Sequence, residues 1–538
     1  MSAVEASRSR SATHEVVNQP PPLADYDPFA ADIALREALD REGGEWGRDR
    51  VGELARILGS TEALEHAKRA QRNIPVLHTH DRYGNRVDEI EYDPSMHWML
   101  RLGVDRQVNT LPWRDPRDGA HVVRAAMFHL FNQLDTGPCC PFAINYAAVP
   151  TMRQDPELAA EWEERLTLPD YDRFAQAGMA FTEKQGGSDL RANSTVAEPV
   201  GDGWYELTGH KWFCTHPVFD VFFTLAQTDN GIACFVANRP HPGFRIQRLK
   251  DKLGGRCLAS SEVEYDHLPA RLLGEEGRGT AFIVEQLVYT RLDTLIAVTG
   301  MMRRGVAEAV WHARHRNAFG APLADQPAMT NVLADLALES EAATVSTIRL
   351  ARAFDDRSGD QPAFRRLALA VLKYWVCKRG APLAAEALEC LGGNGYVEEA
   401  FMAQLYRDIQ LGTVWEGSGN VIALDVLRAL AREPGCVEAF LAECELAAGA
   451  DPRFDSHLAA LRDRLLAPPG SLPDAEWRAR RLVEDMALAL EASLLLRHSP
   501  AFVSSAFCAG RLEHRGLAFG DLPASVDGPA IVERALAL

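Results

Sequence analysis

Two short segments carry side chains whose types and spacing could do chemistry. In residues 181–189 (FTEKQGGSD), two glycines allow a ligand to approach the backbone, and the hydroxyls can donate to an anion or a heterocycle. In residues 415–420 (WEGSGN), a carboxylate beside an indole precedes a helix and could act as a base in a dry pocket. Taken singly, the first also fits a domain-crossing turn, and the second fits a helix-capping turn with a solvated carboxylate even better.

Other candidate motifs are weaker. Gly392 and Gly393 follow a long helical pattern, and their backbone N–H groups could meet a phosphate, although glycine is also common after a helix end. A dinucleotide fingerprint of the type G-x-G-x-x-G is missing between a strand and a helix. Histidine pairs occur at 78/80 and 312/315 without further ligands at suitable spacing, so we expect no metal site.

The elements that must position these segments follow from hydrophobic periodicity. Apolar residues recur at helical spacing from about 31 to 175, and again from 280 to about 431 in stretches at 280–317, 327–356 and 362–391. Between these regions the pattern alternates and predicts short antiparallel strands, at about 195–200, 204–214, 218–227, 232–238, 244–248 and 260–266. Residues 1–30 are polar and proline-bearing, which indicates an extended arm with little structure of its own.

Composition limits the class of protein. The 538 residues are 47% hydrophobic and 25% charged, which is typical of globular chains with more than one domain. A net charge of −18 argues against nucleic-acid binding through overall charge. The ten cysteines form no C-x-x-C pair, and no apolar run is long enough to span a membrane. We therefore expect free thiols and a soluble cytoplasmic protein that does not act at a membrane.

Five motifs in a fixed order resemble those of the acyl-CoA dehydrogenase flavoproteins. They are T-E-K-Q-G-G-S-D, G-H-K-W-F-C-T, R-x-x-F-G-x-P-L, L-G-G-N-G-Y and W-E-G-S-G-N, and each is weak alone. The arm N-Q-P-P-P-L, L-K-D-K-L-G and D-V-L-R, with an added C-terminal helical region, are similar to the AidB branch, the alkylation-response homologues. The resemblance covers the chain from about residue 16.

This resemblance implies an α+β fold in five parts. They are the arm (1–30), an N-terminal helical domain (31–180), a middle antiparallel β-domain (181–275), a four-helix bundle (276–432) and an additional C-terminal helical domain (433–538). It also implies FAD at a site shared between the subunits of a homo-oligomer, expected to be a tetramer. The cofactor-binding residues that it implies are Thr182, Gly187, Ser188, Trp212, Phe213, Thr215, Arg316, Phe319, Gly392, Gly393, Ser418 and Asn420.

The implied reaction is the oxidation of an acyl-CoA thioester. Glu416 matches the family's catalytic base and would take the α-proton while the β-hydride moves to flavin N5, near which Thr215 is placed. Trp415, in place of the usual tyrosine, would narrow the acyl pocket. Thr290 occupies a second position that holds the base in some relatives. Arg291 would be structural or contact the CoA side, and Arg428 would place a charge near the pocket or form an ion pair within the bundle.

The AidB branch is also linked with double-stranded DNA, through its C-terminal helices. Residues 437–538 hold ten arginines and no lysine against fifteen acidic residues, so a mixed-charge solvated face explains them at least as well. The arginines that could form a basic face are Arg478, Arg480, Arg481, Arg497, Arg511 and Arg515. The alternative function is accordingly a DNA-binding flavoprotein of the alkylation response with weak or vestigial dehydrogenase activity; a flavin-binding scaffold without turnover is a third reading.

Overall fold

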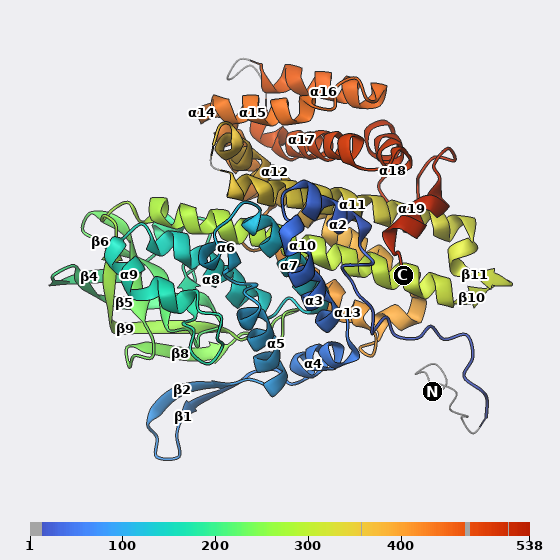
Figure 1. Cartoon of the computed structure of the whole chain (residues 1–538). Helices are drawn as coiled ribbons and strands as arrows, with labels where there is room; N and C mark the ends of the chain where they lie inside the picture. Colours follow the sequence, from blue (N-terminus) through green and yellow to red (C-terminus); the bar gives the residue numbers. More distant parts are fainter. Residues whose placement is uncertain (1–12, 357, 468–473, 515) are drawn as a thin grey trace. The chain divides into compact units, whose positions relative to one another are not determined.

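The computed structural model describes residues 13–356, 358–467, 474–514 and 516–538. The chain forms two compact units (Figure 1). One comprises residues 61–297 with the short segment 415–417, and we call it the β-unit. The other comprises the residues up to 60, 298–414 and 418–538, and we call it the helical unit. Each is described by itself.

The β-unit begins with helices and a small hairpin. The expectation of an all-helical region before residue 175 is wrong in one place, because residues 76–91 pair as a two-stranded antiparallel sheet. The chain turns back between its strands at Gly84, whose φ of +86° suits glycine. The elements are α4 (Thr61–Arg72), β1 (Val76–His80), β2 (Arg86–Glu91), α5 (Pro94–Asp105), α6 (Leu111–Arg114), α7 (Ala120–Leu134), α8 (Cys139–Met152) and α9 (Pro156–Leu166).

The seven-stranded sheet of the β-unit closes on itself. Its strands follow the order β3-β6-β4-β5-β9-β7, and further pairing of β6 with β7 completes a ring, with β8 added to β9. β4 and β5 form a hairpin, and Asp202 and Gly203 adopt positive φ in the turn between them. The strands are β3 (Ala177–Ala180), β4 (Val196–Gly201), β5 (Trp204–Thr215), β6 (Val221–Thr228), β7 (Gly231–Asn238), β8 (Phe244–Leu249) and β9 (Ser260–Leu273).

Two details of the sheet differ from the prediction. β3 pairs with β6 in parallel, so the sheet is mixed and not purely antiparallel. β9 extends to Leu273, because its second half pairs with β7 and with the start of β5. Along β6 both faces are buried, as in the run Phe222, Phe223 and Leu225, which explains why it reads as a continuous apolar stretch.

The helical unit is a bundle extended by C-terminal helices. Within it α12 packs against α11, α13, α14, α15 and α17. The predicted long helices are confirmed to within two residues; α10 contributes its second half here. The elements are α2 (Ile33–Arg41), α3 (Arg48–Leu58), α10 (Gly279–His315), β10 (Asn317–Ala318), β11 (Ala321–Pro322), α11 (Pro327–Asp355), α12 (Gln361–Cys390), α13 (Phe401–Ile409), α14 (Gly419–Arg432), α15 (Pro434–Glu445), α16 (Pro452–Leu465), α17 (Ala475–His498), α18 (Ala501–Phe507) and α19 (Gly528–Ala535).

Single-turn segments link these elements. They include η2 (Leu190–Ala192), η4 (Gly392–Tyr396), η5 (Gln410–Thr413) and the π-helical turn η6 (Cys508–Glu513). All ten cysteines are free and buried. Among the described residues, no helix is long and apolar enough to cross a membrane, and no three His, Cys, Asp or Glu side chains gather where they could hold a metal ion.

Candidate active site

Glu416 lies in a tight loop of the β-unit. Its backbone has φ of +56°, a left-handed conformation that non-glycine residues rarely adopt and that often occurs at functional sites. The Thr290 hydroxyl of α10 donates to Glu416 Oε2 at 2.7 Å. The Arg291 guanidinium Nε donates to the Glu416 backbone carbonyl at 3.1 Å. Two consecutive residues of α10 therefore hold both the carboxylate and the backbone of Glu416.

The α10 segment that carries Thr290 is itself fixed by a buried ion pair. Arg124 of α7 donates through Nη2 to Asp293 Oδ2 at 2.7 Å, and both side chains are only 1% exposed. Arg124 also donates to the Val108 carbonyl at 2.8 Å. Because an unpaired charge at this depth would be costly, the pair restricts the position of α10 on α7. Thr290 lies one turn before Asp293 on α10, so the ion pair also restricts the position of Thr290.

The pKa of the Cys140 thiol, in α8, depends on two charged residues of this part of the site. Burial raises the pKa of the Cys140 thiol to about 12, while Lys252 opposes the shift and Glu416 adds to it. The thiol therefore stays protonated at neutral pH. Lys252, from the L-K-D-K-L-G segment, and Glu416 thus act on the Cys140 thiol with opposite sign.

The 182–189 segment is anchored to the sheet through Glu183. Lys211 of β5 donates to Glu183 Oε1 at 2.6 Å, and neither side chain is exposed. Ser194 and Thr195 add four hydrogen bonds from backbone and hydroxyl groups, at 2.6–3.2 Å. Burial alone would raise the pKa of Glu183, but Lys211 and these hydrogen bonds outweigh it and hold the pKa far below its usual range.

The pKa of Lys211, the cation of the same ion pair, is also shifted. Burial lowers the pKa of Lys211 to about 8, although Glu183 partly compensates. The pair is thus ionised at neutral pH. It fixes the start of a segment whose later residues, Ser188 among them, are exposed. At Gly187 a side chain would meet Thr182 Oγ1 at 2.6 Å, so only glycine lets the segment fold back over Thr182.

The β5 residues assigned to the flavin lie against the two lysines of L-K-D-K. Lys250 Nζ lies 3.0 Å from the Trp212 ring centroid and 4.7 Å from that of Phe213, which is 48% exposed. Lys252 Nζ donates to Ser260 Oγ at 3.1 Å, and Ser260 Oγ lies 3.2 Å from Thr215 Oγ1. An ammonium group can only donate, so the Ser260 hydroxyl is available to donate to Thr215.

The remaining cofactor candidates belong to the helical unit. Arg316 stands between α10 and the β10–β11 hairpin, whose tip carries Phe319 with φ of +53° and full exposure. Gly392, with φ of +57°, and Gly393 form the start of η4; a Cβ on either would meet no atom within 4 Å. Backbone amides there can be approached by a ligand. Gln326 donates to the Ala318 carbonyl at 3.2 Å, inside this hairpin region.

From Gly419 onward the chain forms α14, which contacts the C-terminal helices α15 and α17. Asn420 Oδ1 accepts from Arg480 Nε of α17 at 2.8 Å, and Ser418 is the N-terminal flanking residue of α14. Arg428 pairs with Asp425 at 3.2 Å and is 58% exposed, which matches the ion-pair reading of this residue. Asp425 in turn accepts from Arg366 at 3.2 Å.

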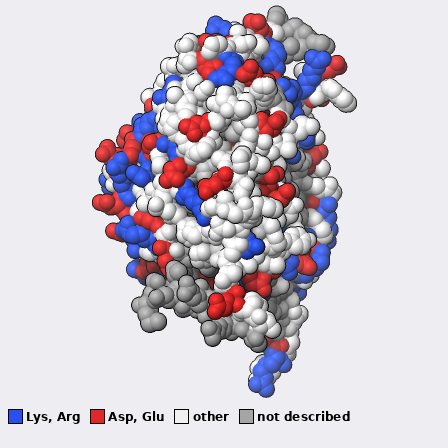
Figure 2. Space-filling model, turned by 90° about the vertical axis from the view of Figure 1, so that its right-hand side faces the viewer, with Lys and Arg blue, Asp and Glu red and all other residues white. Residues whose placement is uncertain are grey.

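The C-terminal arginines differ in what they contact. Arg511 pairs with Asp335 and Glu339 and is 13% exposed, and Arg497 pairs with Glu443. Both are internal. Arg478, Arg480 and Arg481 are exposed along α17, with Arg481 pairing Asp485, and Arg515 lies outside the described residues. On the face drawn in Figure 2, positive and negative side chains are interspersed.

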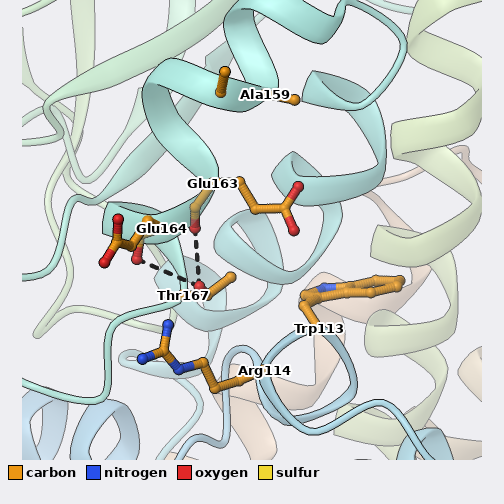
Figure 3. A pocket seen from close by; sticks show the side chains of 7 residues that line it. Trp113, Arg114, Ala159, Glu163, Glu164 and Thr167 are labelled. Atoms are coloured by element: carbon orange, nitrogen blue, oxygen red, sulfur yellow. Dashed lines mark hydrogen bonds between the residues drawn. The ribbon is translucent and has the colours of Figure 1, made fainter.

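A separate pocket of the β-unit involves none of these residues. It lies between α6 and α9 and is lined by Trp113, Arg114, Ala159, Ala160, Glu163, Glu164 and Thr167 (Figure 3). Inside it the Thr167 hydroxyl donates to the Glu163 carbonyl of its own helix, and Arg153 pairs with the Glu163 carboxylate. Two of the lining residues, Glu163 and Thr167, therefore already have protein partners.

Sequence reasoning missed several supporting residues. It quoted Glu183, Lys211, Lys250 and Lys252 inside motifs without giving them roles. Only Lys211 carried a signal, because it stands within a predicted strand, where a buried charge would be costly and a partner is expected. The Glu183–Lys211 pair joins residues 28 apart, so spacing alone could not match the partners.

Comparisons with known proteins agree on a family. Three family models match in chain order: the N-terminal domain of adaptive response protein AidB (18–173), the middle domain of acyl-CoA dehydrogenase (178–268) and its C-terminal domain (277–431). The Escherichia coli K12 protein described as putative acyl-CoA dehydrogenase AidB is 38% identical over 521 residues, covering 94% of this chain and 95% of that protein.

Solved structures show the same fold. Caenorhabditis elegans ACDH-11, in complex with C11-CoA, superposes with a TM-score of 0.85 at 24% identity, covering 100% of this chain and 95% of that one. A glutaryl-CoA dehydrogenase from Mycobacterium smegmatis, in complex with FADH2, has a TM-score of 0.59 at 20% identity, covering 75% and 98%.

Proposed function

This chain belongs to the acyl-CoA dehydrogenase family, and we propose that it oxidises an acyl-CoA thioester with FAD as cofactor. The observation that carries this proposal is the Glu416 carboxylate, held by the Thr290 hydroxyl at 2.7 Å on a loop with left-handed backbone. A carboxylate with a fixed orientation is what a general base needs.

The residues present fit FAD. Thr182, Gly187, Trp212 and Thr215 would hold its flavin side, and the open backbone at Gly392 and Gly393 would meet the dinucleotide. Arg316 supports this assignment: it donates to the Asn18 carbonyl, and among residues 13–356, 358–467, 474–514 and 516–538 no carboxylate forms an ion pair with it, so its charge can meet a phosphate. FAD supplies the acceptor for a hydride when it is bound.

The protein's own part in the reaction is to remove a proton. Glu416 would accept the proton from Cα of the thioester, which is only moderately acidic and needs a positioned base. Thr290 cannot replace it, because a hydroxyl is far less basic than a carboxylate; instead it orients Glu416. Lys252 acts electrostatically on the same buried thiol as Glu416, so its positive charge would favour negative charge that develops in this region.

Anaerobic titration tests this function. Acyl-CoAs of short, branched and long chains are added to the FAD-loaded protein while flavin absorbance is recorded. We expect at least one of them to bleach the flavin. Glu416→Gln should retain FAD and lose bleaching, Thr290→Val should slow it, and Thr290→Ser, which keeps the hydroxyl, should preserve it. Failure of every thioester to bleach bound flavin would contradict the proposal.

The proposal includes assembly and location. Phe319 is 100% exposed at the tip of a hairpin, which fits a residue that reaches a second copy of the chain, and we propose a homotetramer with shared FAD sites. Light scattering of the purified protein would measure the assembly. Ten free, buried thiols fit a reducing compartment, so the proposed location is the cytoplasm.

Binding of double-stranded DNA has less support. Only Arg478, Arg480 and Arg481 of the described candidate arginines are exposed together, and Asn420 and Asp485 already accept from two of them. A charge-driven interaction would weaken steeply with salt and in an Arg478→Ala/Arg481→Ala variant. If the affinity for DNA changes neither with salt concentration nor in this variant, the surface around Arg478 and Arg481 does not bind DNA.

A further inference from the structure

The N-terminal arm is bound to the elements that carry the proposed dinucleotide contacts. Residues 13–32 form no helix or strand, in line with the sequence prediction. Several of their polar groups nevertheless have partners within the helical unit. Trp311 of α10 donates through Nε1 to the Pro21 carbonyl at 2.7 Å, and Arg304 donates to the Leu23 carbonyl at 3.3 Å.

The side-chain amide of Asn18 forms two hydrogen bonds with the backbone of Asn317, at the base of the β10–β11 hairpin. Its Nδ2 donates to the Asn317 carbonyl at 2.8 Å, and its Oδ1 accepts from the Asn317 N–H at 2.7 Å. Its own carbonyl accepts from Arg316 Nη1 at 2.6 Å. The φ of +59° at Asn18 directs side chain and carbonyl toward the same two residues, and asparagine tolerates this conformation better than most residues.

Gln19 extends the contact to the glycine turn. Its Oε1 accepts from Asn394 Nδ2 at 3.0 Å, directly after Gly392 and Gly393. Asn317 and Asn394 are 77 residues apart in sequence, and two adjacent arm residues bond to both. The hairpin projects from the end of α10, as Figure 1 shows.

We propose that residues 18 and 19 of the arm are positioning residues for the cofactor site, holding Arg316 and the 392–394 turn to receive the dinucleotide of FAD carried by a second copy of the chain. This inference rests on the proposed function. A guanidinium whose Nη1 is fixed on a carbonyl keeps its other N–H groups for phosphate and loses less conformational entropy on binding.

FAD affinity of the full-length protein tests the proposal without relying on turnover. Flavin is removed, and rebinding is measured by the quenching of FAD fluorescence. Asn18→Ala should raise the dissociation constant about tenfold, which corresponds to the loss of roughly one to two hydrogen bonds. Asn18→Gly, which keeps the backbone conformation and the carbonyl bond to Arg316, should have a smaller effect. Val17→Ser is the matched control, since Val17 is 72% exposed, and should bind as wild type.

Coupling to Arg316 separates positioning from general stability. Arg316→Met should weaken FAD binding, and adding Asn18→Ala to it should cause little further loss, because the arm acts through that guanidinium. Asn18→Asp should bind FAD less well than Asn18→Ala, since it places a negative charge beside Arg316. Additive effects in the double variant, or equal affinity in Asn18→Ala and Val17→Ser, would overturn the proposal.

The same measurements distinguish this proposal from the proposed function. A wild-type protein that takes up no FAD contradicts both. A wild-type protein that binds FAD and is bleached by a thioester, with Asn18→Ala unchanged in affinity and subunit number, contradicts only the role of the arm. Thermal unfolding of each variant identifies a loss of FAD binding that comes from misfolding. If Asn18→Ala misfolds, the FAD affinity of Asn18→Gly tests the role of the arm instead.

Discussion

Glu183 in the β-unit and Glu339 in the helical unit are both buried carboxylates, but different groups stabilise them. Glu183 accepts from one lysine and from the short residues Ser194 and Thr195. Glu339 of α11 accepts from two arginines, Arg379 at 2.9 Å and Arg511 at 2.8 Å. Removal of one cation therefore leaves Glu183 without any, whereas Glu339 keeps a second.

The positions of the two clusters in the chain also differ. Glu183 joins neighbouring segments of one sheet and fixes a segment proposed to contact the cofactor. Glu339 joins α11 to α12 and to η6, so it fastens the C-terminal region onto the bundle. Arginine suits the second task, because its planar group bridges two carboxylates at once: Arg511 also pairs with Asp335 at 2.6 Å.

The largest effect is expected for Lys211→Met. It leaves Glu183 charged and buried without its cation, which typically costs about 3–5 kcal/mol of the free energy of unfolding. Lys68→Met is the control, since Lys68 is 38% exposed on α4 and pairs with Glu65 at the surface. Chemical unfolding of both variants measures the difference, and similar midpoints would remove the distinction between a buried and a surface lysine.

Glu339→Gln should cost less, about 2–3 kcal/mol, because Asp335 continues to neutralise Arg511. The loss should appear as earlier proteolysis of the C-terminal region, beyond residue 433. A cost equal to that of Lys211→Met would show that Asp335 does not compensate Arg511 for the lost Glu339 carboxylate.

Acid should weaken the Glu339 cluster. Burial would raise its pKa, but Arg379 and Arg511 prevail and lower it to about 2. In the unfolded chain this group titrates near its ordinary value, so the unfolded state binds more protons as the pH falls from about 5 to 2 and stability drops by up to about 3 kcal/mol. Unfolding as a function of pH should show a smaller slope in Glu339→Gln.

Glu491→Gln should have the smallest effect, within about 1 kcal/mol. Burial, with Glu339 adding to it, raises the pKa of Glu491 well above its ordinary value and so favours the uncharged carboxyl group. Glutamine keeps an oxygen that can accept from Trp375 Nε1, now at 3.2 Å. A large destabilisation would mean that the carboxyl group is ionised in the folded protein.

The sequence predicted elements better than contacts. Alternation and turn residues located β4 to β9, because burial on one face of a strand leaves a direct pattern in composition. The 76–91 hairpin was missed, since three of the five residues of β1 and four of the six residues of β2 are exposed and carry little apolar signal. Glu416 was selected through resemblance, whereas its bonds to Thr290 and Arg291 required coordinates, because they join residues about 125 apart.

The C-terminal arginines also show that the sequence predicts contacts less well than elements. Composition correctly described residues 437–538 as a mixed-charge region, yet could not separate Arg511, bound to two carboxylates, from the exposed Arg478. Helical spacing gives the face of a residue, but which neighbouring helix covers that face depends on tertiary packing. The arm was predicted as extended, and its hydrogen bonds to Asn317 and Asn394 had no local signal.

Because every cysteine is buried, the reactivity of the native thiols can be used to measure transient local opening of the structure. Apolar surroundings keep thiols such as Cys377 and Cys444 in the unreactive protonated form. A maleimide can then modify a given sulfur only when its surroundings open transiently, and the labelling rate at each position measures the free energy of that local opening. Native cysteines on both units would thus map the least stable regions without any engineered probe.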